Sequence, residues 1–395
     1  MRIVYLSLIF QMLWILPAWS SEEADEESVT NELGYVAMEG FIEGRQPVTA
    51  YLWFEPNHKG GIWVLGSLHE TSPRKCTRIH GSKSKESDEL SLYLSSNTHG
   101  GETIGCLEAK WNKSTETDLA SLTGNLRMLK GGSSPVIQLR EIKPPGSVEL
   151  DYHRFEESYE RSRGINTLHR QLGIAFPQIT TSDPNHRAIN ETIRHWARYL
   201  LEDSSVTPDL TKTSPKLTEI EGVLRAELPD RSEPEQMVIN RQEDIRISHV
   251  MEVLYNQNGL LCLRITTTKD LGGAHEMFYS QHLTFDLLTG SVLKANDLLN
   301  KGWKAAIAPI AADNLREQFE LEAGAKLSAA GLKDEDFKLN DNFFINNEGL
   351  GFYFDPYEIA PFSLGAITPI ISLHKISSLI RQGSALWRIQ ECQTE

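Results

Sequence analysis

The sequence predicts an α+β protein in which a small antiparallel β-barrel or sandwich precedes a second domain, an antiparallel sheet with packed helices. Three observations support this. Short apolar runs separated by Gly, Asn and Ser clusters fill residues 34–142, an amphipathic helix follows Asp183, and hairpin patterns alternate with helices from Ile245 onward. The segment Lys143-Pro144-Pro145-Gly146 interrupts the β pattern and predicts the domain boundary.

The first twenty residues predict a signal peptide. Arg2 precedes an apolar run from Ile3 to Leu16, and Ala18-Trp19-Ser20 places small residues at −3 and −1 of a cleavage point. The run is shorter than the ~20 apolar residues of a membrane span, although an uncleaved anchor is the alternative. We therefore expect a soluble periplasmic or secreted protein that does not span a membrane after cleavage. Residues 21–33 are acidic and predict a disordered start of the mature chain.

The β domain spans residues 34–142. Its strands are short and alternate between apolar and polar residues, although aromatic residues blur the alternation in the first of them. Such strands are typical of a barrel or a sandwich, and the pattern does not decide between the two. The predicted strands are Val48–Phe54, Ile62–Leu68, Leu90–Leu94, Ile104–Trp111 and Val136–Leu139.

The second domain is predicted over residues 150–382, and residues 383–395 are predicted to be a tail. A strand ends near Ile179, and Asp183-Pro184 begins a helix with a buried face. Asp297 is expected to cap a later helix that uses Trp303 on its buried side. The other elements are strands over residues 261–266 and 282–287, a hairpin over residues 343–354, and a strand near residues 367–373.

The four cysteines indicate no metal or redox motif. Cys76 and Cys106 both fall in the β domain and could form a disulfide in an oxidising compartment. Cys262 lies inside an apolar strand and is expected to be a buried thiol. Because no C-x-x-C spacing occurs, a zinc ribbon and a thioredoxin-like site are both excluded.

The charge and motif content exclude several function classes. The formal net charge is −15, which repels phosphate backbones, so nucleic-acid binding is not expected, whereas a basic protein would be attracted. The closest two histidines are His275 and His282, which excludes H-E-x-x-H zinc sites. There is no P-loop and no G-x-S-x-G motif. We therefore predict no cofactor, no metal and no catalytic residue.

The segment Gly272-Gly273-Ala274-His275 is the first candidate binding site. Paired glycines allow a sharp bend that would place His275 at the edge of the following strand, which also carries Tyr279. A binding loop is one interpretation. The other is a β-bulge in which His275 is hydrogen-bonded into the fold.

The second candidate is the aromatic segment from Phe352 to Gly365. It carries Tyr353, Tyr357 and Glu358 on a turn between two prolines. Exposed aromatic residues on a rigid turn are suited to anchoring a protein or a sugar. The alternative is that these rings fill the end of the core.

The segment Thr284-Phe285-Asp286 resembles the T-F-D-D motif of zinc polysaccharide deacetylases. Leu287 stands where that motif has its second Asp, so a deacetylase is not indicated. The alternation of this strand predicts that Asp286 faces away from the core.

Residues 165–382 resemble the C-terminal extracytoplasmic domain of RsiV-type anti-sigma factors, which also accompanies the catalytic domain of PdaC-type peptidoglycan deacetylases. The N-terminal β domain is similar to small barrels that precede this domain. The resemblance implies binding of lysozyme, a basic protein. We expect neither transmembrane signalling nor deacetylation, because the chain has no corresponding helix or catalytic domain. The matching segments are Tyr255–Leu261, Gly272–His275, Tyr279-Ser280, Leu283–Asp286, Thr289-Gly290, Phe352–Phe354, Tyr357–Pro361 and Gly365.

The leading hypothesis is an exported binding module for a lysozyme-like protein or a peptidoglycan fragment. The expected contact residues are Gly272, Gly273, His275, Tyr279, Tyr353, Tyr357 and Glu358. The second hypothesis is a cell-wall hydrolase, for which Glu276, Asp286, Asp355 and Glu358 are the nearest carboxylates. A third is an envelope scaffold protein without a soluble ligand.

Overall fold

The structure described is a computed structural model. The predicted signal peptide and acidic N-terminus lie outside the described residues. None of the helices in the described part of the chain is long and apolar enough to cross a membrane. The described residues are 34–44, 47–56, 61–71, 74–83, 87–96, 103–114, 119–129, 134–163, 166–202, 213–227, 244–273, 275–333 and 337–392.

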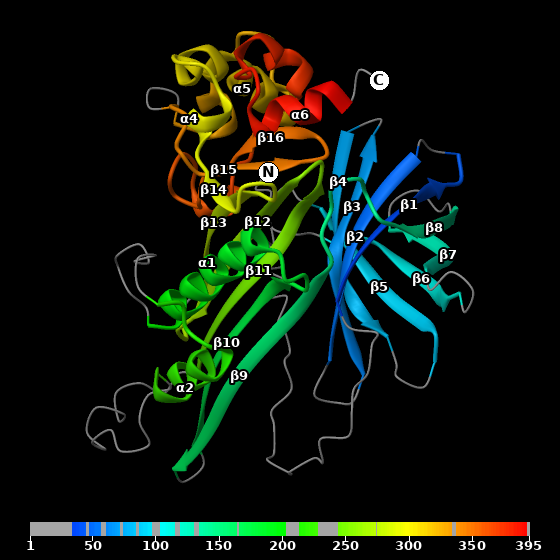
Figure 1. The fold of residues 1–395 in the computed structure, drawn as a ribbon, viewed down its shortest axis with the longest axis vertical. Coiled ribbons are helices and arrows are strands. Elements are labelled where there is room, and N and C mark those ends of the chain that lie inside the picture. Colours follow the sequence, from blue (N-terminus) through cyan, green and yellow to red (C-terminus); the bar gives the residue numbers. More distant parts are fainter. Residues whose placement is uncertain are drawn as a thin grey trace, which may run out of the picture. The chain divides into compact units, whose positions relative to one another are not determined.

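The N-terminal strands form a closed barrel, which decides between the two architectures that the sequence allowed (Figure 1). Each strand pairs antiparallel with the next, and β8 closes the barrel on β1 with Ala37 opposite Ile142. The strands are β1 (Gly34–Ile42), β2 (Pro47–Pro56), β3 (Ile62–Thr71), β4 (Arg74–Lys83), β5 (Glu89–Ser96), β6 (Thr103–Lys113), β7 (Ala120–Met128) and β8 (Val136–Ile142).

Apolar side chains fill the barrel interior, as expected for eight strands. The outward face is less uniform. Tyr51 and Trp53 point outward from β2 but are only 1% and 3% exposed. Trp53 stacks on Tyr152 with ring centroids 6.2 Å apart, and Tyr51 Oη accepts a hydrogen bond from Asn347 Nδ2 at 2.6 Å. These contacts explain why aromatic residues blur the alternation of β2.

Sequence reasoning found five of the eight strands and missed β1, β4 and β7. The missed strands lack continuous apolar alternation. In β4, Gly81 occupies an inward position. A Cβ there would lie 2.1 Å from the carbonyl oxygen of Ser91, so the position requires glycine. Where close backbone approach requires glycine, the apolar signal of the strand is lost.

The second sheet has six strands in the order β14-β13-β12-β11-β10-β9. It is antiparallel except for the pair β10 and β11, which is parallel. This exception was not expected; it arises because the chain passes over the sheet through two helices between these strands. The strands are β9 (Leu150–Arg163), β10 (Asn166–Ile179), β11 (Ile245–Gln257), β12 (Leu260–Asp270), β13 (Met277–Asp286) and β14 (Ser291–Leu293).

The helices α1 (Pro184–Leu201) and α2 (Leu217–Glu227) lie over one face of this sheet (Figure 1). The prediction for α1 is confirmed, because the Asp183 carboxylate accepts a hydrogen bond from Asn185 N at 2.8 Å. The six predicted apolar positions are all buried against the sheet: Ile189, Ile193, Trp196, Ala197, Leu200 and Leu201.

The remaining C-terminal elements form a second core that includes Tyr255, Leu260 and Cys262 of the sheet. Asp297 lies in the short α4 and accepts from Lys294 N, so it does not cap the helix of Trp303 as predicted. The segment predicted to be a tail contributes α6. The elements are α4 (Ala295–Leu298), α5 (Trp303–Gln318), η1 (Leu327–Ala330), β15 (Phe343–Asn346), β16 (Gly349–Phe352), η2 (Phe362–Leu364), β17 (Ile370–Ile371), η3 (Leu373–Leu379) and α6 (Ala385–Cys392).

The disulfide proposed from the sequence is not formed. Cys106 is a free thiol in β6. Cys76 lies in β4, and its side chain is not among those that the structure describes. Because β5 separates the two strands, their backbones are about 10 Å apart, too far for a disulfide. Cys262 is a fully buried free thiol as predicted, and burial raises its pKa to about 11.

Candidate functional site

The two segments singled out in the sequence meet at one exposed corner of the second domain. His275 stacks on Phe362 with ring centroids 3.8 Å apart. Tyr357 and Phe278 approach the same Phe362 ring at 5.6 Å and 5.9 Å. We call these four residues the aromatic corner. It joins the β12–β13 loop to the turn that follows β16, although the two are far apart in the sequence.

The loop reaches the corner by a tight turn. Gly272 has a positive φ of 73° and donates its N–H to the Asp270 carboxylate at 3.1 Å. The pairing of β12 with β13 continues in register up to Lys269 and Met277, so the predicted β-bulge is absent. His275 is exposed, and its Nδ1 lies 2.8 Å from the carbonyl oxygen of Glu276.

Tyr357 is held in a conformation that bulky residues rarely adopt. Its φ is 72°, and its side chain is 60% exposed. Its N–H donates to the carbonyl of Ala360 at 3.0 Å. The Lys333 ammonium donates to the carbonyls of Tyr357 and Glu358 at 3.1 Å and 3.2 Å. A strained residue held by its surroundings is typical of functional sites.

The preceding part of the aromatic segment has a different role. Phe352, Tyr353 and Phe354 are at most 5% exposed, so the interpretation of core filling is correct for them. Tyr353 is therefore buried, and its ring packs against His282 with ring centroids 5.2 Å apart. Tyr279 lies on β13 next to Phe278, and neighbouring residues of a strand point to opposite faces of a sheet. The structure thus brings His275 and Tyr357 together without Tyr279.

A polar layer fixes the turn to β13. The Asp355 carboxylate accepts a hydrogen bond from Ser280 N at 2.9 Å, and Asn342 Nδ2 donates to Ser280 O at 2.7 Å. Asn342 Oδ1 then lies 2.8 Å from His282 Nδ1, which must carry the proton. Burial lowers the pKa of His282 to about 3, so the imidazole is neutral at physiological pH. These contacts position the corner and had no local signal in the sequence.

The carboxylates at this corner are in unfavourable surroundings for negative charge. The pKa of Asp355 is raised to about 6, mainly by burial and also by the nearby Glu358 carboxylate, although the hydrogen bond from Ser280 lowers it. Partial burial and the Asp270 carboxylate raise the pKa of Glu276. Glu358 accepts from Asp355 N at 3.0 Å and from Asn340 Nδ2 at 3.1 Å, so it also stabilises the turn.

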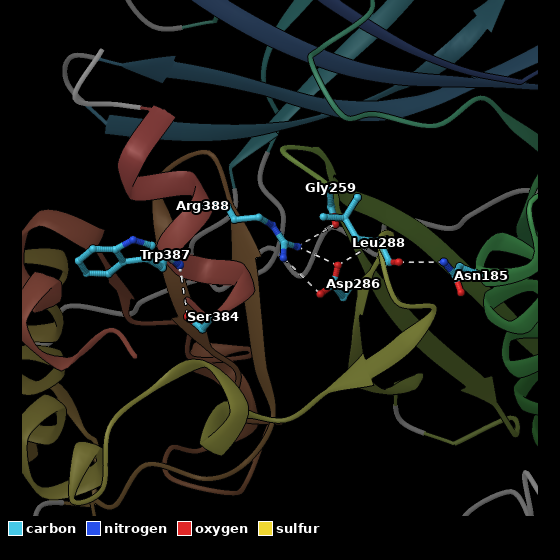
Figure 2. A network of polar contacts seen from close by, with 7 residues as sticks. All are labelled: Asn185, Gly259, Asp286, Leu288, Ser384, Trp387 and Arg388. Atoms are coloured by element: carbon cyan, nitrogen blue, oxygen red, sulfur yellow. Dashed lines mark hydrogen bonds and ion pairs between the residues drawn. The ribbon is translucent and has the colours of Figure 1, made fainter. Parts of the chain in front are cut away.

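Asp286, at the other end of β13, was predicted to face away from the core and is instead 6% exposed. Its carboxylate accepts two hydrogen bonds from the Arg388 guanidinium, at 2.8 Å and 3.3 Å (Figure 2). Arg388 also donates to Gly259 O at 3.4 Å. Because α6 covers this end, Asp286 serves packing and is unsuited to the hydrolytic role considered from the sequence.

Within the described residues, no group of three or more His, Cys, Asp or Glu side chains could hold a metal ion. The residues that sequence reasoning missed are Phe278, Phe362, Lys333, Ser280 and Asn342. Phe362 stood inside the aromatic segment and could have been chosen by its neighbouring prolines. Phe278 and Ser280 stood in the segment that follows Gly272, but their residue types did not mark them. Lys333 and Asn342 offered no pattern, because each acts through a contact with a distant part of the chain.

The chain is thus a two-domain protein. A closed eight-stranded barrel is followed by an α+β domain that carries the exposed aromatic corner. Residues 296–374 match the family described as "Protein of unknown function (DUF3298)". This range includes Tyr357 and Phe362 but not His275. No curated protein matches the chain.

Two solved structures are similar to this chain. A DUF3298 family member from Bacteroides fragilis NCTC 9343 has 16% identity and a TM-score of 0.52, over 63% of this chain and 100% of that chain. A DUF3298 family protein from Pseudomonas aeruginosa PAO1 has 17% identity and a TM-score of 0.43, over 60% of this chain and 96% of that chain. The Bacteroides structure shows a shared fold.

Proposed function

We propose that this protein is exported to the cell envelope and binds a lysozyme-like protein or a cell-wall fragment through the aromatic corner. The observation that carries the proposal is the stacking of His275 on Phe362 beside the exposed ring of Tyr357, whose backbone has a positive φ. Exposed aromatic anchors on a rigid support are typical of binding sites. The resemblance to RsiV-type and PdaC-type domains suggests the same class of ligand.

The polar layer supports binding rather than turnover. Asp355 and Glu358 both accept backbone hydrogen bonds that hold the turn. Carboxylates used in this way preorganise the corner before a ligand arrives, which lowers the entropy cost of binding. A rigid corner with a strained residue is what a recognition surface requires.

A hydrolase is a second candidate, and one observation favours it. The raised pKa of Asp355, about 6, would suit a general acid near neutral pH. Asp355→Asn and Glu358→Gln separate the two functions. In a hydrolase both variants lose wall-degrading turnover while still binding the substrate, whereas in a binding module they change only affinity.

Titration calorimetry of the full chain tests the proposal. The titrants are hen-type and bacterial-type lysozymes and soluble peptidoglycan fragments, at moderate and high salt, with muramidase activity followed alongside. We expect saturable binding that persists as salt rises, because rings as well as charges make the contact. The complete loss of heat at high salt would contradict the proposal.

His275→Ala locates the binding site. Because His275 is exposed, its removal should weaken binding about tenfold without unfolding the protein. His80→Ala is the matched control, since His80 stacks on Tyr93 with ring centroids 5.6 Å apart on the barrel. Equal losses in the two variants would place the binding surface elsewhere.

A further inference from the structure

The aromatic corner carries negative charge that the described chain does not neutralise. Its two segments contribute four carboxylates, and none of them forms an ion pair with another described residue. The Lys333 ammonium lies at the turn, where it donates hydrogen bonds to the backbone carbonyls of Tyr357 and Glu358. The carboxylates are Asp270, Glu276, Asp355 and Glu358.

These carboxylates lie close enough to affect one another. Burial is the main cause of the raised pKa values of Glu276 and Asp355; Asp270 adds to the first and Glu358 to the second, whereas His275 lowers the pKa of Glu276. Like charges held together are stabilised by an incoming cation. Glu276 is the most available of the four, because its carboxylate forms no hydrogen bond within the described residues.

The rings at the corner add a second attraction for a cation. Tyr357 is 60% exposed, and the exposed His275 ring lies over Phe362. A lysine or arginine over an aromatic face gains cation–π energy, and arginine also stacks on the ring. An uncharged glycan would leave the four carboxylates without a partner.

We propose that the aromatic corner recognises a protein partner through a lysine or arginine side chain. The cation lies against the exposed ring of Tyr357, and the Glu276 carboxylate supplies the counter-charge. This inference rests on the proposed function and names the chemistry of the partner surface. It selects a basic protein over a cell-wall glycan as the ligand.

The test uses the full chain and two probes: hen-type lysozyme, and a short arginine peptide with its citrulline counterpart, which keeps the shape and loses the charge. The variants are Glu276→Gln and Tyr357→Asn. Asparagine is chosen because it tolerates a positive φ, so the turn keeps its conformation. Glu89→Gln is the matched control, an exposed carboxylate on the barrel strand β5.

We expect the wild-type chain to bind lysozyme and the arginine peptide but not the citrulline peptide. Glu276→Gln and Tyr357→Asn should each weaken both interactions about tenfold, and Glu89→Gln should change neither. If Tyr357→Asn abolishes lysozyme binding while Glu276→Gln and the citrulline exchange have no effect, the corner binds without a cation, and this inference alone fails. If neither probe binds, this inference fails, and the peptidoglycan titration then decides the proposed function. If lysozyme binds but no variant changes the affinity, the corner is not the binding surface, and the proposed function fails with this inference.

Discussion

The two ends of β13 carry carboxylates in opposite situations. At the end of the strand, Asp286 is buried and accepts two hydrogen bonds from Arg388 on α6. Beside its beginning, Asp355 and Glu276 have raised pKa values and form no ion pair with another described residue, although the neighbouring His275 opposes the rise in the pKa of Glu276. The first end is closed by the chain itself, and the second is exposed at the aromatic corner.

This difference separates a structural charge from a candidate binding charge. A buried carboxylate is tolerated when a guanidinium pairs with it in a favourable geometry. Carboxylates that accumulate without a cation reduce stability, and such a cost is commonly found at sites that bind something. The same contrast holds for the backbone, because the strained Tyr357 belongs to the open end.

The largest effect is expected at the closed end. Arg388→Met removes the partner of Asp286 and should lower the free energy of unfolding by about 3 kcal/mol, because a buried carboxylate is left unpaired. Urea denaturation measures this loss. Asp286→Asn combined with Arg388→Met should restore part of it. Equal stability of the wild type and Arg388→Met would show that the pair does not hold α6.

A smaller effect is expected for the support of the open end. Lys333→Met removes two hydrogen bonds to the carbonyls of Tyr357 and Glu358. The cost should be about 1 kcal/mol of unfolding free energy. Partner affinity should fall several-fold as the turn loosens. Lys143→Met, which removes an exposed ion pair with Glu149 before β9, serves as the control. An unchanged affinity in Lys333→Met would mean that Lys333 does not position the turn.

At Tyr357 the expected change in the free energy of unfolding has the opposite sign. Tyr357→Gly relieves the positive φ and should raise the free energy of unfolding by roughly 0.5 kcal/mol, while partner binding weakens about tenfold, as in Tyr357→Asn. Thermal melting and calorimetry on the same samples compare the two properties. A clear loss of stability in this variant would instead give Tyr357 a packing role.

The effect expected at Asp355 is a change in the pH dependence of stability. Its pKa is raised from 3.8 to about 6, so the folded state binds the proton more tightly than the unfolded state. The resulting stability is present below pH 3.8 and is lost as the pH rises through 6. Asp355→Asn should remove this slope from the curve of unfolding free energy between pH 4 and pH 7. A slope that is unchanged in Asp355→Asn must come from other groups.

Some of this molecule could be predicted from the sequence because the signals are local. The helix α1 was found in full, since its cap and its buried face repeat at helical spacing. The hairpin of β15 and β16 was found because a turn separates two apolar runs. The sequence also singled out Gly272, His275 and Tyr357, and the structure places the rings of His275 and Tyr357 against Phe362.

Other features were decided by the tertiary structure. The sequence determined on its own that a β domain precedes an α+β domain, because periodicity records which side chains must be buried. Barrel closure, the burial of Asp286 under α6, and the contact of His275 with Phe362 depend on segments that are distant in the chain. Local patterns carry no information about such partners, since their energies arise only when the folded chain brings the groups together.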